Sequence, residues 1–186
     1  MNLTLLKGYP DFVGKRATFV GYGNGPASYA RGGDVVTLPL PGYYIDAMDG
    51  GASSVSGNYI ASPIPSSVGP RATWKVRWLF NGSQQGVDGV ALTTPGTGGT
   101  NGTATINATG GGGTGAQVQT VTAGGIITSA TVINPGTGYT TAPTFTPAAG
   151  TGALTATIGA LNGVEVGAGT SLATEQVQIG GFCGQY

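Results

Sequence analysis

The stretch from residue 72 to residue 80 constrains the fold more than any other part of the chain, because its side chains alternate in character. Four bulky apolar side chains fall on one side of an extended backbone: Trp74, Val76, Trp78 and Phe80. The other side carries Thr73, Lys75 and Arg77. Period-two alternation is what a strand with one buried face requires. Since both tryptophans of the chain lie here and aromatic side chains carry the largest apolar area, we predict the central core strand of a β-domain.

Short runs of β-forming residues, separated by glycine and proline, make up the rest of the chain. The chain has 37 glycines and only 8% charged residues, yet it is rich in Val, Ile and Thr, unlike most disordered chains. No stretch combines helical spacing with capping residues. In its first half we expect strands at 3–6, 16–21, 35–40, 43–48, 58–61 and 72–80. The predicted fold is all-β, with a compact β-sandwich or barrel-like base domain.

A long uncharged segment follows, with no Asp, Glu, Lys or Arg between residues 89 and 164. Residues 93–160 contain 20 threonines and 16 glycines but only 11 large apolar side chains. Burial of so few side chains gives little to set against the conformational entropy of ordering the segment. We therefore expect support from the base domain or from copies of the segment in an oligomer.

This uncharged segment contains an internal repeat. Pro-Gly-Thr-Gly at residues 95–98 recurs at 135–138, and Gly-Thr-Gly-Ala at 113–116 recurs at 150–153. After the second motif of each copy we expect a strand, a glycine turn and a returning strand. The expected strands are 117–122 and 154–158, and the turns are 124–125 and 162–163. A period near forty residues in two copies predicts a duplicated β-hairpin unit.

Charges return after Val164, and Val177 and Ile179 alternate with glutamines in one more strand. We expect this strand to rejoin the base domain beside residues 72–80. The predicted organisation is a base domain of residues 1–92, rejoined by about 164–186. Residues 93–163 then form a projecting Gly/Thr-rich repeat module, inserted before the last strand.

Composition argues against several classes of function. The net charge is zero and no basic stripe exists, so we expect no nucleic-acid partner. No apolar run approaches the roughly 18 residues of a membrane helix. The chain has no histidine and one cysteine, Cys183, which rules out an internal disulfide, a Cys/His zinc site and every nucleophile–histidine pair. We expect Cys183 to be a small buried thiol, and we expect no enzyme activity, cofactor or metal.

Asp46 and Asp49 offer a carboxylate pair, which a calcium loop or a small hydrolase would need. Their Asp-x-x-Asp spacing lacks the alternating oxygen ligands of a calcium loop. We therefore interpret both as carboxylates that solvate a loop. The N-terminus lacks the basic-then-apolar layout of a signal peptide, so we expect synthesis and assembly in a cytoplasm.

All seven basic residues precede residue 78. They are either a solvated face of the base domain or the part of it that docks onto an acidic protein surface. Under the second interpretation, six of them are the candidate contacts: Lys15, Arg16, Arg31, Arg71, Lys75 and Arg77.

Several short motifs resemble known proteins. Residues 12–16 (Phe-Val-Gly-Lys-Arg), 28–34 (Ser-Tyr-Ala-Arg-Gly-Gly-Asp) and 42–46 (Gly-Tyr-Tyr-Ile-Asp) are similar to the opening of small structural proteins encoded near tailed-phage capsid genes. The closing strand after Gly169-Thr170-Ser171-Leu172 is similar as well. Residues 134–143 resemble a Gly-Ser/Thr-Gly-Tyr module of phage virion and bacterial surface proteins.

The resemblance implies a capsid decoration (cement) protein, which binds the major capsid protein on the phage head surface and is assembled in the host cytoplasm. We expect self-association, with a trimer as the favoured form. Many modest contacts that exist only on the assembled shell would stabilise it. The alternative is a tail-associated or surface adhesin whose module binds a host glycan. Such a module would need aromatic platforms, and Tyr139 and Phe145 are its only aromatic residues.

Overall fold

The computed structural model describes residues 1–6, 11–13, 16–49, 51–67, 73–82, 84–147 and 151–185, with the side chains of 11–13 left out. Every regular element in this part of the chain is a β-strand, and the sheets are antiparallel. The prediction of an all-β fold is therefore confirmed. None of the sheets closes into a barrel, and a sandwich-like arrangement is compatible with them.

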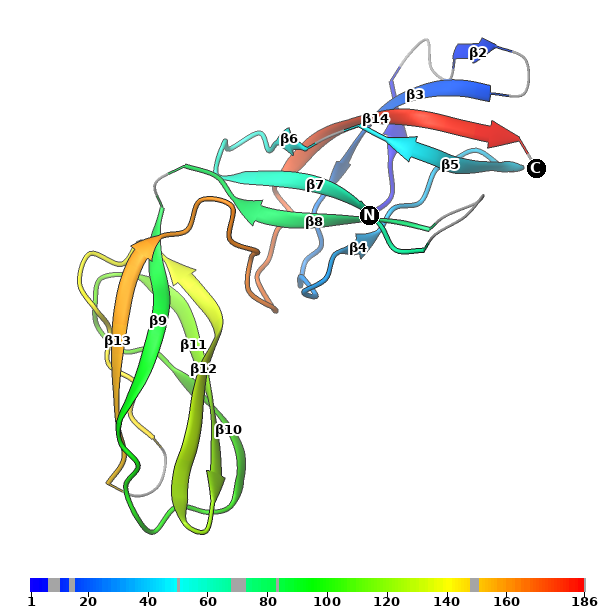
Figure 1. Cartoon of the computed structure of the whole chain (residues 1–186). Coiled ribbons are helices and arrows are strands. Elements are labelled where there is room, and N and C mark those ends of the chain that lie inside the picture. The colour runs from blue at the N-terminus through cyan, green and yellow to red at the C-terminus, as the bar shows by residue number, and fades with distance from the viewer. Residues whose placement is uncertain are drawn as a thin grey trace. The chain divides into compact units, whose positions relative to one another are not determined.

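The chain divides into two compact units (Figure 1). Unit 1 comprises Met1–Asn81 and Gly163–Tyr186, and unit 2 comprises Gly82–Asn162. Sequence reasoning placed the boundary at residue 92, which lies inside strand β9 (Gln85–Thr94) of unit 2. The loss of charge after residue 88 marks a change in composition, whereas β9 already buries Val87 in the core of unit 2.

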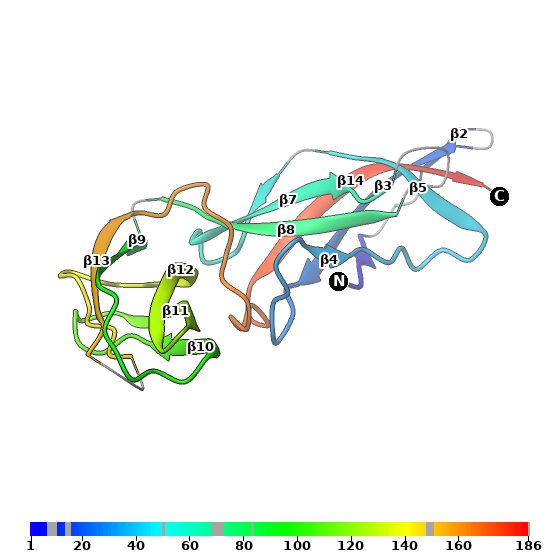
Figure 2. The ribbon, with the colours of Figure 1, turned by 60° about the horizontal axis from the view of Figure 1, so that its bottom comes forward.

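The first sheet of unit 1 is built on two long neighbouring strands, β3 (Arg16–Asn24) and β14 (Gln176–Gln185), which lie side by side in Figures 1 and 2. The other strands are β1 (Thr4–Leu5) and β2 (Asp11–Val13), which pair with β3, and β5 (Tyr43–Met48), which pairs with β14. In β3, buried and less buried residues alternate along its length. This sheet therefore has one core-facing side and one outward side.

The second sheet of unit 1 has the order β4 (Asp34–Val35), β8 (Trp74–Phe80), β7 (Tyr59–Pro65) and β6 (Ala52–Ser53). The strand expected at 72–80 is thus β8, and the part that the structure describes is central in its sheet. The strand expected at 35–40 is wrong in length, because only Asp34–Val35 pairs with β8. Pro39 and Pro41 have no N–H to donate to a ladder, so the strand cannot continue.

The core of unit 1 takes buried side chains from both sheets. Val76, Trp78 and Phe80 of β8 are at most 2% exposed, as predicted from the alternation, whereas Trp74, predicted on the same face, is only half-buried. Phe19 and Cys183 from the other sheet are fully buried as well. The prediction of a buried thiol is therefore confirmed, and its sulfur lies 3.6 Å from the carbonyl oxygen of Ala17.

The prediction that the last strand returns beside β8 is wrong. β14 pairs with β3 on one side and β5 on the other, both in the first sheet. The segment that does return to β8 is shorter and precedes β14: Glu165 bridges to Leu79, and Val166 N–H donates to the Trp78 carbonyl oxygen at 3.0 Å. Alternation in β14 identifies a strand with one buried face, but it carries no information about the partner.

Unit 2 has a three-stranded sheet of β10 (Gly102–Asn107), β11 (Thr114–Ala123) and β12 (Ile126–Thr137), which lie side by side in Figure 2. A second pair joins β13 (Ala153–Ala160) to β9. Seven side chains form its buried core: Val87, Ile106, Ala116, Val118, Tyr139, Phe145 and Ala156.

The expected hairpin of the first repeat exists, since β11 and β12 pair around Gly124-Gly125. The expected hairpin of the second repeat does not. β13 pairs backwards with β9, and beyond it Gly163 N–H donates to the Phe80 carbonyl oxygen in unit 1 at 2.9 Å. The hairpin is therefore not duplicated: the strand of the second repeat pairs with β9, which precedes the first repeat, and the order of the motifs in the sequence does not reveal that partner.

Candidate functional site

The structure separates the basic residues that the sequence grouped together. Arg16 begins β3 in the first sheet of unit 1, and Arg31 is exposed in the loop between β3 and β4. Lys75 and Arg77 are two residues apart on β8 in the second sheet. Lys15 and Arg71 lie outside the described residues. Of the four that are described, the pair Lys75 and Arg77 therefore shares one strand face.

Lys75 and Arg77 point away from the core, because they alternate with the buried residues of β8. Directly across the sheet, Lys75 has Val35 of β4 on one side and Ile64 of β7 on the other, and Arg77 has Ser62 of β7. We call these five residues the β8 face. Val35 is 48% exposed, so the face presents two cations set among aliphatic side chains.

The cations of the β8 face have no carboxylate partner among the described residues. The ion pair that the described part of the chain does contain joins the Arg16 guanidinium to the Asp46 carboxylate, 3.2 Å apart, in the other sheet. The Nε atom of Arg77 is buried and has no hydrogen-bond partner in the same part of the chain. A buried polar atom without a partner is uncommon in folded proteins. An external acceptor could not reach this buried Nε, so it is the lack of a carboxylate partner in the described part of the chain that leaves the Lys75 ammonium and the rest of the Arg77 guanidinium for such an acceptor.

Asp34 is directly across from the buried Val76 in the pairing of β4 with β8. It therefore lies on the side of the sheet opposite to the β8 face. Burial raises the pKa of the Asp34 carboxyl, while the N-terminal ammonium and Lys75 lower it. One of its carboxyl oxygens is buried without a hydrogen-bond partner in the described residues. Asp34 is therefore a poorly solvated carboxylate, and not a close ion-pair partner of Lys75.

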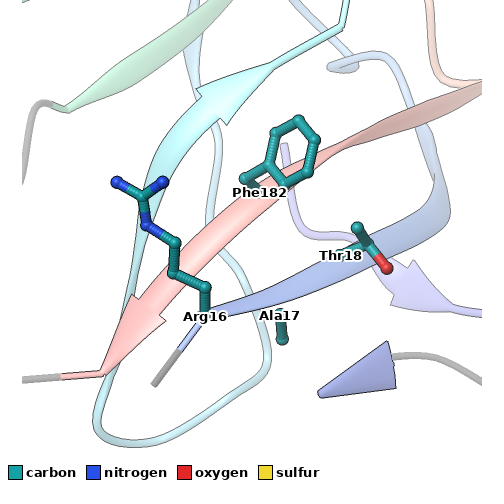
Figure 3. Close-up of a pocket in the computed structure, with 4 residues that line it drawn as sticks. All are labelled: Arg16, Ala17, Thr18 and Phe182. Atoms are coloured by element: carbon teal, nitrogen blue, oxygen red, sulfur yellow. The ribbon is translucent and has the colours of Figure 1, made fainter. Parts of the chain in front are cut away.

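A second exposed feature lies on the outward side of the first sheet. Phe182 of β14 is 47% exposed and borders a shallow depression of about 260 Å³ with Arg16, Ala17 and Thr18 (Figure 3). Thr18 is directly opposite Phe182 on β3. In Figure 3 the side chains of Arg16 and Phe182 project from the same side of their strands. The depression is slightly smaller than the roughly 300–1,000 Å³ of ordinary ligand pockets.

A partly buried polar cluster, which sequence reasoning missed, anchors two loops to β8. The Tyr29 hydroxyl donates to the Glu165 carboxylate (2.6 Å) and accepts from the Trp78 N–H (3.3 Å). The Gly32 N–H donates to the same carboxylate oxygen at 2.6 Å. Burial and the bond to Glu165 raise the pKa of Tyr29. Because Tyr29 is only 1% exposed, we interpret the cluster as structural: it fixes the two loops on β8. The signal available in the sequence was that Glu165 is the first charged residue after the uncharged segment.

The carboxylate pair considered for catalysis or calcium has other contacts. Asp46 pairs with Arg16, and the Asp49 carboxylate lies over the backbone of Gly180. Among the described residues, no group of three or more His, Cys, Asp or Glu side chains could hold a metal ion.

The aromatic residues of the uncharged segment are not available as a platform. Tyr139 and Phe145 are each 2% exposed and belong to the core of unit 2. Tyr139 also accepts a hydrogen bond from the Ala116 N–H at its hydroxyl, 3.3 Å away. A glycan that stacks on aromatic rings would therefore find neither ring on the surface of unit 2.

Comparison with protein-family models, curated proteins and solved structures found no match. In the part of the chain that the structure describes, no helix is long and apolar enough to cross a membrane. Any functional assignment therefore rests on the short motifs and on the geometry above.

Proposed function

We propose that the protein is a non-enzymatic structural component of a bacteriophage head, attached to the outer surface through the β8 face. The observation that carries the proposal is the pair of cations on this face, Lys75 and Arg77, which have no carboxylate partner among the described residues. The phage-like motifs of the sequence support the same assignment. The partner would be an acidic patch on the major capsid protein.

The β8 face has the composition of a docking surface. Lys75 and Arg77 would attract and orient an acidic partner, since charge complementarity mainly sets association rate and specificity. Val35 and Ile64 would supply apolar area to bury, at roughly 25 cal/mol per Å². Each copy would contribute a modest contact. A shell that carries many copies gains stability because the contacts exist only in the assembled state.

Unit 2 would not share in this charge attraction. Its residues 82–162 include a single charged residue, Asp88, whose carboxylate accepts a hydrogen bond from Thr157 at 2.7 Å. A nearly neutral surface of Thr, Ser, Gln and Asn is suited to face solvent without competing for the capsid. The glycan-binding alternative loses support because Tyr139 and Phe145 are buried.

Binding to purified undecorated heads tests the proposal. The variant Lys75→Gln/Arg77→Gln removes two positive charges from the β8 face. We expect it to lower the apparent affinity for heads by at least about tenfold. The matched control, Gln178→Glu/Gln185→Glu, changes the net charge by the same two units on exposed positions of β14. It should bind as the wild type does.

Three outcomes would contradict the proposal. The first is a wild-type chain that shows no saturable binding to heads. The second is equal loss of affinity in both variants, because net charge and not the β8 face would then be responsible. The third is binding to host cells or cell-wall polysaccharide in place of heads, which would favour the adhesin.

A further inference from the structure

Unit 2 contains two copies of one strand pair. β9 precedes the first Pro-Gly-Thr-Gly motif and pairs with β13, whereas β12 contains the second motif and pairs with β11. Both pairings skip a residue at the same two places. Thr93 and Ile133 are each two residues before the proline of their motif, and Asp88 and Thr128 are each seven before it. The two pairs are therefore equivalent in register as well as in sequence.

The contacts between the copies are reciprocal. Tyr139 N–H donates to the Gln85 carbonyl oxygen at 3.3 Å, and Gly99 N–H donates to the Gly125 carbonyl oxygen at 2.9 Å. Tyr139 and Gly99 are forty residues apart, and so are Gly125 and Gln85, so the second bond is the counterpart of the first with the two copies exchanged. Reciprocal contacts of this kind relate two copies by an approximate two-fold axis. Unit 2 therefore resembles a symmetric dimer made from one chain.

The symmetry does not extend to β10, which has no equivalent strand in the described part of the second copy. In the first copy, β10 covers the outer edge of β11 along six residue pairs, from Gly102↔Thr122 to Asn107↔Gln117. The equivalent segment of the second copy, residues 142–147, does not pair with β13. Its neighbourhood bonds to the first copy instead, through Thr140 and Thr141 to Gly111 and through Thr144 to Thr109. Among the described residues, β9 is therefore the only strand that pairs with β13.

β13 itself lacks two of the usual devices that prevent strand pairing, a charged residue and a proline. Its sequence, Ala-Leu-Thr-Ala-Thr-Ile-Gly-Ala, contains no charged residue and no proline. Thr155 and Thr157 are exposed, and the strand is eight residues long. Natural edge strands are normally short, charged, interrupted by proline or covered. An edge like this one is a template for an added strand.

We propose that β13 pairs along its outer edge with a strand of a second copy of this chain, in the place that β10 occupies on β11. The chain itself supplies suitable strands. β10 is also an uncharged terminal strand of its sheet, and β13 could pair with its own counterpart. Self-association of this kind does not depend on capsid attachment, because it uses unit 2 and takes place in the free protein.

The test is the concentration dependence of mass for the full chain, measured by light scattering and sedimentation. We expect the wild type to self-associate. Thr155→Lys places a charge on the open edge and should raise the apparent dissociation constant at least about tenfold. Gln119→Lys is the matched control, since Gln119 is also exposed but belongs to β11, which is paired on both sides. It should associate as the wild type does.

A third variant identifies the added strand. Loss of association in Thr105→Lys as well would identify β10 of the second copy, and unchanged association would identify β13; either result supports pairing at the β13 edge. A wild type that stays monomeric at its highest soluble concentration would overturn the proposal. Equal weakening by Thr155→Lys and Gln119→Lys would do the same. Thermal unfolding of each variant shows whether a loss of association merely reflects a loss of folding.

Discussion

Gly136 is a position where the packing of unit 2 leaves no room for one added methyl group. Its backbone is left-handed (φ +61°), and a Cβ there would lie against the Thr114 carbonyl oxygen and the Ala116 nitrogen. Both contacts are backbone atoms at the start of β11, so neither can rotate away. Gly124 in the β11–β12 turn has the same φ of +61°, but a Cβ there would meet nothing within 4 Å.

Comparison of Gly136→Ala with Gly124→Ala separates the cost of a left-handed backbone from the cost of a packing clash. For Gly124→Ala we expect a loss of about 1–2 kcal/mol in the free energy of unfolding, the cost of a left-handed alanine. For Gly136→Ala the same strain adds to a clash that must shift β11 relative to β12. We expect a total loss of about 3–5 kcal/mol, the range of severe core lesions.

The assay has to report on unit 2. Both tryptophans lie in unit 1, so urea unfolding should be followed by far-ultraviolet circular dichroism, or thermal unfolding by calorimetry. The midpoint of the unit 2 transition should fall much further for Gly136→Ala than for Gly124→Ala. Similar losses in the two variants would refute the reasoning, because the close approach of the two copies at Gly136 would then have no energetic weight.

Four further predictions concern unit 1. Tyr29→Phe should lower the free energy of unfolding by about 1–3 kcal/mol, because the Glu165 carboxylate and the backbone N–H of Trp78 lose their common hydrogen-bond partner. Urea unfolding followed by tryptophan fluorescence measures this loss. An unchanged unfolding midpoint would contradict a stabilising role for the Tyr29 hydroxyl. Burial raises the pKa of Tyr29 above its ordinary value near 10. The contribution of the protonated Tyr29 to stability is therefore complete below pH 10 and is lost as pH rises through the folded pKa. The loss of stability at alkaline pH should be smaller in Tyr29→Phe than in the wild type, and identical curves of stability against pH would contradict this prediction. The raised pKa of Asp34 has the same sign: protonation favours the fold, so Asp34→Asn should exceed the wild type in melting temperature at pH 7 and match it near pH 3, and a less stable Asn variant at pH 7 would be contrary to this. Finally, replacing residues 82–162 by a short Gly/Ser loop should leave unit 1 folded and soluble, since Gly163 N–H already bonds to the Phe80 carbonyl oxygen at 2.9 Å; an unfolded product would show that unit 1 needs unit 2.

Local features of this fold were predictable from the sequence, and pairing partners were not. The described part of β8 and all of β5 were expected because alternation and flanking turns are properties of neighbouring residues. The partner of β14 and the pairing of β13 with β9 depend on contacts between distant segments, which a single sequence does not encode in any local pattern. The hydrogen bond from Tyr29 to Glu165 spans 136 residues and was missed for the same reason.

The candidate site shows the same division. The chain order of charges identified Lys75 and Arg77 among six candidates, because all basic residues precede residue 78. It could not tell that Arg16 pairs with Asp46 in a different sheet. Knowing which cations share one surface requires the strand register of β4, β7 and β8.

The most direct test of the account is the reactivity of the Lys75 ammonium group towards an acylating reagent, measured by mass spectrometry with and without saturating phage heads. If the β8 face is the attachment surface, the labelling rate of Lys75 should fall at least about tenfold on the head, because the ammonium group is then covered by the capsid. A labelling rate that is unchanged on fully occupied heads would contradict attachment through this face.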